Sequence, residues 1–330
     1  MDRRSTLGEN AESTDLKDYY EERFSGGYMS YWSPLQRSRV HDVVAALPLR
    51  EVGQALDFGC GQGVMTNEVK EALPPGWRVI ATDLSDKALR KGAERYPDLT
   101  FEASSSLVDS GRKFDLVFTH HVLEYVGDLP GTLDAINHFV LPGGVLVHAL
   151  PCGNAGSLEW NLCQRVDGGL ESERGNRFFF EEDGHLRRLT SHELIDLLAD
   201  RGFRLTQEFF AGHKWVAIEW ISASHPRLVF QVTPIGRARG ISNLLWLAGA
   251  RMILVALNAA RAPLVLHRRS RSKADLSPLG QWLSRVSRLL VPVSRPFDSW
   301  ITKRAQTEWI ARRSVKSGSE MYLIFEKHAV

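Results

Sequence analysis

Residues 55–66 read ALDFGCGQGVMT, in which an apolar run is followed by three glycines at alternate positions and then by a helical pattern. The run from Gln54 to Phe58 is short and apolar, which indicates a buried strand. Gly59, Gly61 and Gly63 then allow a sharp turn and let a ligand approach the backbone, because no Cβ stands in the way. The segment that follows has a helical pattern, so its free N–H groups would point at that ligand.

An acidic residue lies where a nucleotide-binding strand would end. Asp83 comes 20 residues after Gly63 and follows a second predicted strand. An acid at this place can accept hydrogen bonds from both ribose hydroxyls. The dinucleotide-binding pattern G-x-G-x-x-G would need glycine where the chain has Val64 or Thr66. The spacing D-x-G-x-G-x-G therefore disfavours a dinucleotide site and leaves another nucleotide cofactor as the alternative.

Strands and helices alternate through most of the chain. Strands are expected at 54–58, 78–82, 99–102, 114–118, 145–150, 203–210 and 321–326, and helices at 34–47, 64–73, 85–96, 129–141 and 192–201. This order predicts an α/β fold with a doubly wound, mostly parallel seven-stranded sheet. Residues 151–189 are expected to be a loop, and a helical insertion precedes the last strand.

Five segments resemble the motifs of class I methyltransferases that depend on S-adenosyl-L-methionine (SAM). The resemblance covers residues 52–211 and includes the late helix of small-molecule O-methyltransferases, among them those of quinone biosynthesis. The segments are LDFGCGQG (56–63), ATDLS (81–85), FDLVFTHHVLEYV (114–126), LPGGVLVHALP (141–151) and GHLRRLTSHELIDLLADRGF (184–203).

The resemblance implies SAM as the cofactor and assigns a role to each part of the turn. The methionine part of SAM would lie on the first motif, the ribose on Asp83, and the adenine beside Leu84. Many relatives place an aspartate after the third strand for the adenine amino group, where this chain has Ala103-Ser104-Ser105-Ser106, so a serine or a backbone group must replace it. The cofactor residues expected are Asp57, Gly59, Cys60, Gly61, Gly63, Asp83, Leu84, Ser105 and His120.

Three histidines are candidate catalytic bases, since methyl transfer to a hydroxyl needs proton removal as well as alignment. His120 and His121 follow the fourth strand, at the sheet edge where open α/β folds bind ligands. His185 precedes the late helix. His148, by contrast, alternates with valines in a buried strand and is expected to be structural, and His192 is expected at the surface.

Glu124 lies three residues after His121 and can be interpreted in two ways. It could orient a basic histidine, or the two could belong to an incomplete metal site. Quinone-pathway relatives carry Glu and Glu-His where this chain has His121 and Glu124-Tyr125, so the match is partial. No metal is assigned.

The predicted activity is SAM-dependent methyl transfer to oxygen on a small or lipid-linked acceptor. An RNA methyltransferase that uses the basic insertion, and a non-catalytic SAM-fold interaction module, are the alternatives. Residues 119–122 read THHV, which differs from the (Asn/Asp/Ser)-Pro-Pro-aromatic motif of enzymes that methylate base nitrogens. Nucleic acid is therefore a disfavoured partner, and the oligomeric state stays open.

The insertion differs from the rest of the chain in charge. Residues 227–316 contain 17 Lys/Arg and 3 Asp/Glu, a net charge of +14, which leaves 24 minus 36, or −12, for the remainder. Leu244 to Leu266 is apolar apart from a stripe with Arg251, Asn258 and Arg261, and a second amphipathic pattern starts at Leu279. Apolar faces with flanking arginines are typical of helices in a membrane interface. We expect residues 240–295 to contact an anionic membrane surface, with a helical cap or RNA binding as alternatives.

The predicted organisation has three parts. They are a mobile N-terminal tail (1–18), a SAM-binding methyltransferase domain (19–212 plus 319–330) and a basic amphipathic helical insertion (213–318). The three cysteines lack metal-ligand spacing, and their odd, sparse number indicates a reducing compartment and no disulfide framework. The N-terminus has no apolar signal region. The expected location is cytoplasmic and peripheral on the inner face of the membrane.

Overall fold

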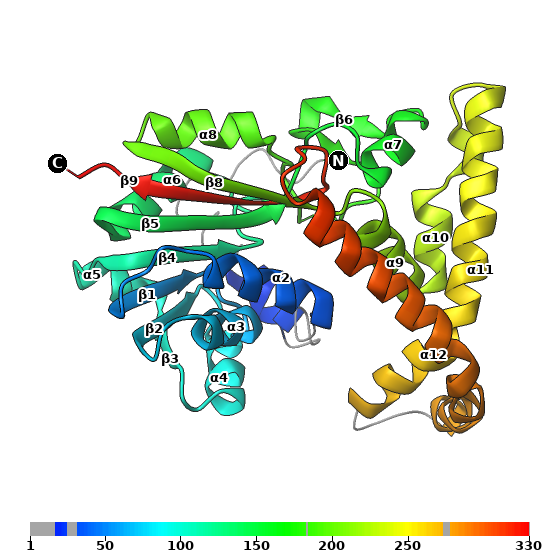
Figure 1. The fold of residues 1–330 in the computed structure, drawn as a ribbon, viewed down its shortest axis with the longest axis horizontal. Coiled ribbons are helices and arrows are strands. Elements are labelled where there is room, and N and C mark those ends of the chain that lie inside the picture. Colours follow the sequence, from blue (N-terminus) through cyan, green and yellow to red (C-terminus); the bar gives the residue numbers. More distant parts are fainter. Residues whose placement is uncertain (1–16, 25–31, 183, 273–277, 330) are drawn as a thin grey trace. The chain divides into compact units, whose positions relative to one another are not determined.

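The computed structural model describes residues 17–24, 32–182, 184–272 and 278–329, without the side chains of Asp109 and residues 269–286. The predicted tail (1–18) lies outside these residues except for 17 and 18, which begin a helix at 17–24. The predicted α/β class is confirmed: the strands form a seven-stranded sheet in the order β3-β2-β1-β4-β5-β9-β8 (Figure 1). They are β1 (Val52–Phe58), β2 (Gly76–Asp83), β3 (Thr100–Ala103), β4 (Phe114–His120), β5 (Val140–Pro151), β8 (Phe203–Ala211) and β9 (Glu320–Lys327).

The register of the central strands brings two candidate segments together. β1 pairs in parallel with β2 on one side and with β4 on the other, and Asp57 lies opposite Phe118 of β4. β4 is buried along most of its length because strands cover both of its edges and helices flank the sheet. The residues that follow β1 and β4 therefore meet at the carboxyl edge of the sheet, where ligands bind in open α/β folds.

The last strand is inserted into the interior of the sheet. β9 lies between β5 and β8, and its arrow runs opposite to that of β5 in Figure 1. The predicted strand at 321–326 is thus confirmed, as is the helical segment that precedes it. The helices are α2 (Pro34–Ala45), α3 (Val64–Ala72), α4 (Asp86–Arg95), α5 (Ser104–Asp109), α6 (Leu129–Phe139), α7 (Leu158–Gln164), α8 (Ser191–Ala199), α9 (Trp215–Ala223), α10 (Pro226–Val232), α11 (Ile241–Ser272) and α12 (Pro278–Arg312).

Two predicted segments are wrong in detail. The helix expected to reach residue 141 ends at Phe139, and β5 begins at once because Val140 pairs with Phe114. Gly143, with φ of 73°, then bends the chain inside the strand instead of ending a helix before it. The loop expected at 151–189 contains α7, the short strands β6 (Leu170–Glu171) and β7 (Arg177–Phe178), and a 3₁₀ turn.

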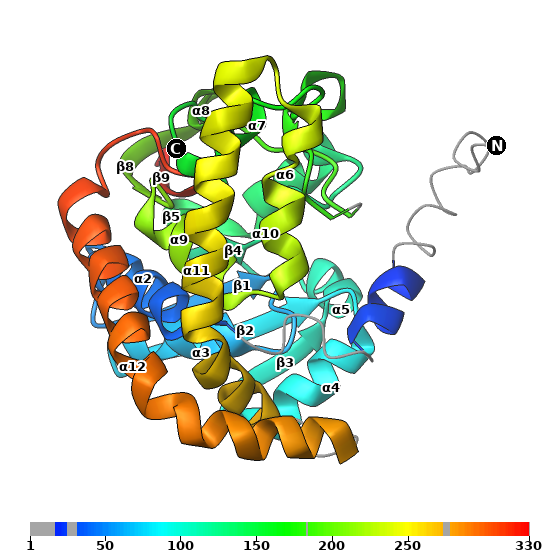
Figure 2. The ribbon, with the colours of Figure 1, turned by 90° about the vertical axis from the view of Figure 1, so that its right-hand side faces the viewer.

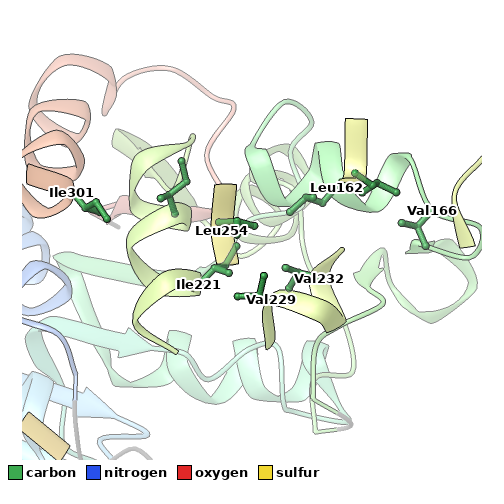
Figure 3. Packing of buried hydrophobic residues seen from close by; sticks show 9 residues of the cluster. Leu162, Val166, Ile221, Val229, Val232, Leu254 and Ile301 are labelled. Carbon is green, nitrogen blue, oxygen red and sulfur yellow. The ribbon is translucent and has the colours of Figure 1, made fainter. Parts of the chain in front are cut away.

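The chain divides into two compact units. The first comprises residues 1–150, 195–208 and 322–330, and the second comprises residues 151–194 and 209–321. Residues 151–194 therefore group with the helical segment, although the predicted methyltransferase domain, 19–212 plus 319–330, includes them. The second unit has its own apolar core, drawn in Figure 3, made of Leu162, Val166, Ile218, Ile221, Val229, Val232, Leu247, Leu254 and Ile301.

Candidate functional site

The turn between β1 and α3 depends on three glycines. Gly59, Gly61 and Gly63 have φ angles of 81°, 54° and 75°, a region that residues with a Cβ rarely adopt. A Cβ on Gly59 would lie 2.4 Å from the Val122 side chain, and one on Gly63 would lie 2.7 Å from Phe101. Packing as well as conformation therefore requires these two glycines, whereas Gly61 has room for a Cβ and lines a cavity.

Asp83, at the end of β2, ties this turn to the neighbouring strand. Its Oδ2 accepts a hydrogen bond from the backbone N–H of Gly61 at 2.8 Å, and its Oδ1 accepts one from Ser85 at 2.9 Å. Burial raises the pKa of Asp83, and these backbone hydrogen bonds oppose the shift. Each carboxylate oxygen keeps a second lone-pair site, so Asp83 can also accept from two vicinal hydroxyls. The neighbouring Leu84 is exposed and can cover a flat base.

Asp57, in β1, contains a buried oxygen atom that lacks a partner. Its Oδ2 accepts a hydrogen bond from the Thr66 hydroxyl at 2.6 Å, while Oδ1 has none among the residues that the structure describes. Burial raises the pKa of Asp57 to about 7; the bond from Thr66 opposes this shift and the charge of Asp83 adds to it. An unsatisfied buried acceptor costs about 1–3 kcal/mol, so a ligand with an N–H donor or a positive charge would be stabilised here.

The raised pKa of Asp57 predicts how stability depends on pH. Between pH 4 and 7 the folded protein holds a proton on Asp57 that the unfolded chain, with a pKa near 3.8, has released. Because the folded state binds more protons, this group makes the free energy of unfolding fall as the pH rises through that window. Asp57→Asn should remove this contribution, so the variant should gain on the order of 2 kcal/mol relative to wild type between pH 5 and pH 8. Urea unfolding of both proteins at pH 5 and pH 8 measures the free energy of unfolding of each. If the variant differs from wild type by the same amount at both pH values, the raised pKa of Asp57 is contradicted.

Three aromatic rings gather where β4 ends. The His120 ring centroid lies 4.5 Å from that of His121 and 4.7 Å from that of Trp32. Burial, together with the charges of His121 and Arg39, lowers the pKa of His120 well below its usual value, so this imidazole is neutral at pH 7. His120 also lines the cavity that borders the glycine turn, and its place beside a cofactor stays a prediction.

His121 has an unusual backbone and a carboxylate partner. Its φ angle is 55°, uncommon for a residue with a side chain, and its N–H donates to the Ala149 carbonyl oxygen at 2.8 Å. Its Nδ1 lies 2.7 Å from Oε1 of Glu124, whose side chain is 1% exposed. The segment between them is a turn and not a helix, yet it brings the pair together. A backbone outlier beside a His–carboxylate pair makes His121 and Glu124 candidates for a functional role.

The other histidines lie in different surroundings. His185, the third candidate base, belongs to the second unit, where its Nδ1 lies 3.6 Å from Oε1 of Glu181. It does not line the cavity at the glycine turn. His148 is fully buried and its Nδ1 is 2.6 Å from the Thr119 hydroxyl, while burial lowers its pKa to about 3. His192 is exposed. The last two therefore have the surroundings that their sequence positions predict.

The serine predicted to contact adenine is not the one that faces the sheet. Ser105 is exposed in the first turn of α5, a helix that was not predicted from the sequence. Its neighbour Ser104 lies closer to the strands, with its hydroxyl 3.1 Å from that of Thr82. The role of Ser105 stays a prediction.

A helix at residues 17–24, which was not predicted, packs against the glycine turn. Phe24 at its end is 3% exposed and lies where a Cβ on Gly61 would touch its ring at 3.6 Å. Its carbonyl oxygen accepts a hydrogen bond from Lys91 at 2.7 Å, which holds the helix on α4. Trp32 was also missed. A signal for the helix was present, because Tyr20 and Phe24 lie four residues apart, which is the spacing of one helical face. The aromatic cluster YMSYW around Trp32 does not by itself place that residue at the site.

A narrow cavity of about 20 Å³ lies between the glycine turn and His120. It is lined by Trp32, Asp57, Gly59, Cys60, Gly61, Gln62, Val64, Met65 and His120. A ligand as large as a nucleoside would enter only if side chains at its mouth move. The residues present nevertheless fit SAM, because the unpartnered oxygen of Asp57 suits its amino group and the open position at Gly61 suits close approach.

Comparison with known proteins gives a consistent picture. Residues 31–208 match a family model described as a methyltransferase domain. The chain is similar to a trans-aconitate 2-methyltransferase of Deinococcus radiodurans, with 33% identity over 49% of this chain and 59% of that protein. It is also similar to a malonyl-[acyl-carrier protein] O-methyltransferase of Pseudescherichia vulneris, with 32% identity over 45% of this chain and 57% of that protein. The chain thus spans less than two thirds of either relative.

Among solved structures, the chain is similar to a magnesium protoporphyrin IX methyltransferase of Synechocystis PCC 6803 with bound SAH. The identity is 17%, the match covers 59% of this chain and 91% of that one, and the TM-score is 0.43.

Proposed function

The chain belongs to the class I SAM-dependent methyltransferases, and from this membership we propose that it transfers a methyl group from SAM to an oxygen atom of a small or lipid-linked acceptor. The observation that carries the proposal is the pairing of a SAM-type glycine turn with a His–carboxylate pair at the adjacent strand end. SAM supplies an activated methyl group on a sulfonium. The protein has to bind it, align the acceptor and remove a proton.

The glycine turn and two aspartates would hold the cofactor. The unpartnered oxygen of Asp57 would accept a hydrogen bond from the amino group of SAM, and Asp83 would accept from the ribose hydroxyls. Because Asp83 already accepts from the backbone of Gly61, the carboxylate fixes both the turn and the sugar. A pre-positioned group of this kind loses little entropy when the ligand binds.

We assign the base to His121, with Glu124 as its positioning residue. A buried carboxylate 2.7 Å from Nδ1 keeps the proton on that nitrogen and leaves Nε2 to accept one from the acceptor hydroxyl. His120 is less suited to the role, because burial holds its pKa well below its usual value. His185 is the alternative base, and a variant at that position distinguishes between His121 and His185.

The names of the relatives support oxygen as the methylated atom and a carried or small acceptor. One is named an O-methyltransferase of an acyl-carrier-protein-bound malonyl group, and another is named for trans-aconitate. For this chain we extend the class to lipid-linked acceptors, because the segment 227–316 carries a net charge of +14 and contains a long apolar helix. We place the protein in the cytoplasm, peripheral to the inner face of the membrane.

Methyl transfer from radiolabelled SAM into a fractionated cell extract tests the proposal. Label should enter the lipid or small-molecule fraction, and exclusive labelling of RNA would contradict it. His121→Ala should then lose about 100-fold in rate or more with unchanged SAM affinity, as expected for a general base. Glu124→Gln should lose less of the methyl-transfer rate than His121→Ala does, and it should shift the pH dependence of that rate. His138→Ala, at an exposed histidine, is the matched control. If His121→Ala keeps its rate and His185→Ala loses it, the base is His185.

A further inference from the structure

Helix α11 has its polar residues on the side that faces the rest of its own unit. Arg261 is fully buried, and its Nη2 lies 2.7 Å from Oδ1 of Asp298 and 2.9 Å from Oε1 of Glu219. The side-chain amide of Asn258 donates to the Ser222 carbonyl oxygen at 2.9 Å. These contacts join α11 to α9 and α12 through hydrogen bonds and not through an apolar seam alone.

Arg251 completes the polar stripe. Its Nε donates to the Thr233 hydroxyl at 3.1 Å, and its guanidinium lies 5.2 Å from the centre of the Phe230 ring. Arg251, Asn258 and Arg261 are spaced by seven and three residues, so they share one face of the helix. The inward side of α11 also carries the buried Leu247, Leu254 and Leu264, as in other surface helices. The unusual feature is that its central part turns no polar residue outward.

The outward face of α11 is apolar throughout its central part. Figure 2 views the helix from this side, with α11 in front. Residues 241–268 have a mean hydropathy of 1.4 in their most apolar window, and only 17% of that window is buried, unlike a core helix. All nine exposed residues between 244 and 266 are apolar: Leu244, Leu245, Trp246, Met252, Ile253, Val255, Ala256, Ala259 and Leu266. A contiguous apolar face of this size marks a contact surface.

Basic groups lie beside a second apolar strip, on α12. Leu289, Val293, Phe297 and Trp300 are exposed and follow the spacing of one helical face. On an adjacent face, Arg288 and Arg295 line an open pocket of about 430 Å³ together with His267 of α11. Neither arginine has a carboxylate or hydrogen-bond partner among the described residues. The pocket therefore presents two uncompensated guanidinium groups next to apolar side chains.

We propose that the outward faces of α11 and α12 form a docking surface for an anionic phospholipid bilayer, with the Arg288/Arg295 pocket holding a headgroup phosphate. Exposed apolar side chains would enter the acyl-chain boundary, and the guanidinium groups would pair with phosphate oxygens. The net charge of +14 on residues 227–316 complements a negative lipid surface. This inference deepens the proposed lipid-linked acceptor and rests on that proposed function, because docking would present such an acceptor to the enzyme.

Docking at the surface fits these helices better than crossing the bilayer. α12 leads the chain back toward β9, so a hairpin could cross without leaving the last strand on the wrong side, and topology alone does not exclude crossing. The exposed Arg288, Arg295 and Lys303 of α12 oppose it, because a charge deep in a bilayer is strongly unfavourable. RNA binding does not account for the nine exposed apolar residues of α11, because contacts with phosphates require basic and polar side chains.

Flotation of the full chain with vesicles tests the proposal. Wild type should float with phosphatidylglycerol–phosphatidylcholine vesicles, float poorly with pure phosphatidylcholine and lose binding as salt rises. The double variant Arg288→Gln/Arg295→Gln should bind about 30-fold more weakly, and Met252→Glu about 10-fold more weakly. The matched control Arg78→Gln/Arg90→Gln removes two exposed arginines from the first unit and should bind like wild type.

The other outcomes overturn the proposal. If wild type does not float with the anionic vesicles, α11 and α12 do not form a membrane-docking surface. If both double variants lose binding equally, the effect is one of net charge and the pocket has no special role. Glycerol phosphate or RNA binding without flotation would assign the pocket to a soluble anion or to nucleic acid. Loss of a dimer in Met252→Glu, measured by sedimentation, would assign the apolar face to a second copy. SAM affinity is measured in every variant, so failure of docking can be distinguished from failure of the catalytic proposal.

Discussion

Replacing Gly61 with valine should weaken SAM binding at least 100-fold while leaving the protein folded. The residue has φ of 54° and its N–H donates to Asp83, so a side chain here strains the turn, and its Cβ lies 3.6 Å from the Phe24 ring at the edge of the cavity that Gly61 lines. The strain costs about 1–2 kcal/mol, which a domain of this size tolerates. Calorimetry with SAM and S-adenosylhomocysteine measures the affinity, and thermal unfolding checks the fold.

Two further variants sharpen the interpretation of the Gly61 result. Gly127→Val is the matched control, because Gly127 has no positive φ and a Cβ there would meet nothing within 4 Å. Asp83→Ala should also weaken SAM binding strongly, since it removes both the ribose acceptor and the anchor of the turn. Normal SAM affinity in Gly61→Val and Asp83→Ala would refute the cofactor site. Binding of NADH in place of SAM would refute the assignment of the cofactor.

The cofactor turn could be predicted because its chemistry depends on local spacing. Gly59, Gly61 and Gly63 occupy conformations that other residues avoid, and Asp83 lies at a fixed distance along one βαβ unit. Phe24 and Trp32 could not be predicted in the same way. They reach the site through tertiary contacts. The four-residue spacing of Tyr20 and Phe24 is compatible with a helix, but no local pattern tells that this helix packs on the glycine turn.

Helix α11 shows a second limit of sequence reasoning. The spacing of Arg251, Asn258 and Arg261 correctly predicts that they share a face, because helical period follows from geometry alone. It does not tell which face points toward solvent. That depends on buried partners far along the chain, such as Asp298 for Arg261, which only the folded structure brings close. Similarly, Val140 joins β5 because Phe114 is available to pair with it.

Deleting residues 320–330 should abolish cooperative folding of the chain. These residues contain β9, which lies between β5 and β8, so the deletion opens the interior of the sheet and not its edge. Met321 to Phe325 are all at most 1% exposed. Losing one large buried side chain costs about 2–5 kcal/mol, so losing five costs about 10–25 kcal/mol, which is comparable to or larger than the 5–15 kcal/mol that stabilises a typical domain. Circular dichroism during heating should show no cooperative transition.

A single substitution in β9 and a shorter truncation serve as controls for the deletion of residues 320–330. Phe325→Ala, which keeps the strand, should lower the free energy of unfolding by about 3–5 kcal/mol and leave a folded protein that binds SAM. Deleting only residues 329 and 330 should change little, because Ala329 is exposed and lies after the strand. If the protein without 320–330 still unfolds cooperatively and binds SAM, then β9 is dispensable. The six strands before the helical segment would then form a complete domain. The helical segment would be an extension of that domain, and not an insertion between β8 and an essential last strand.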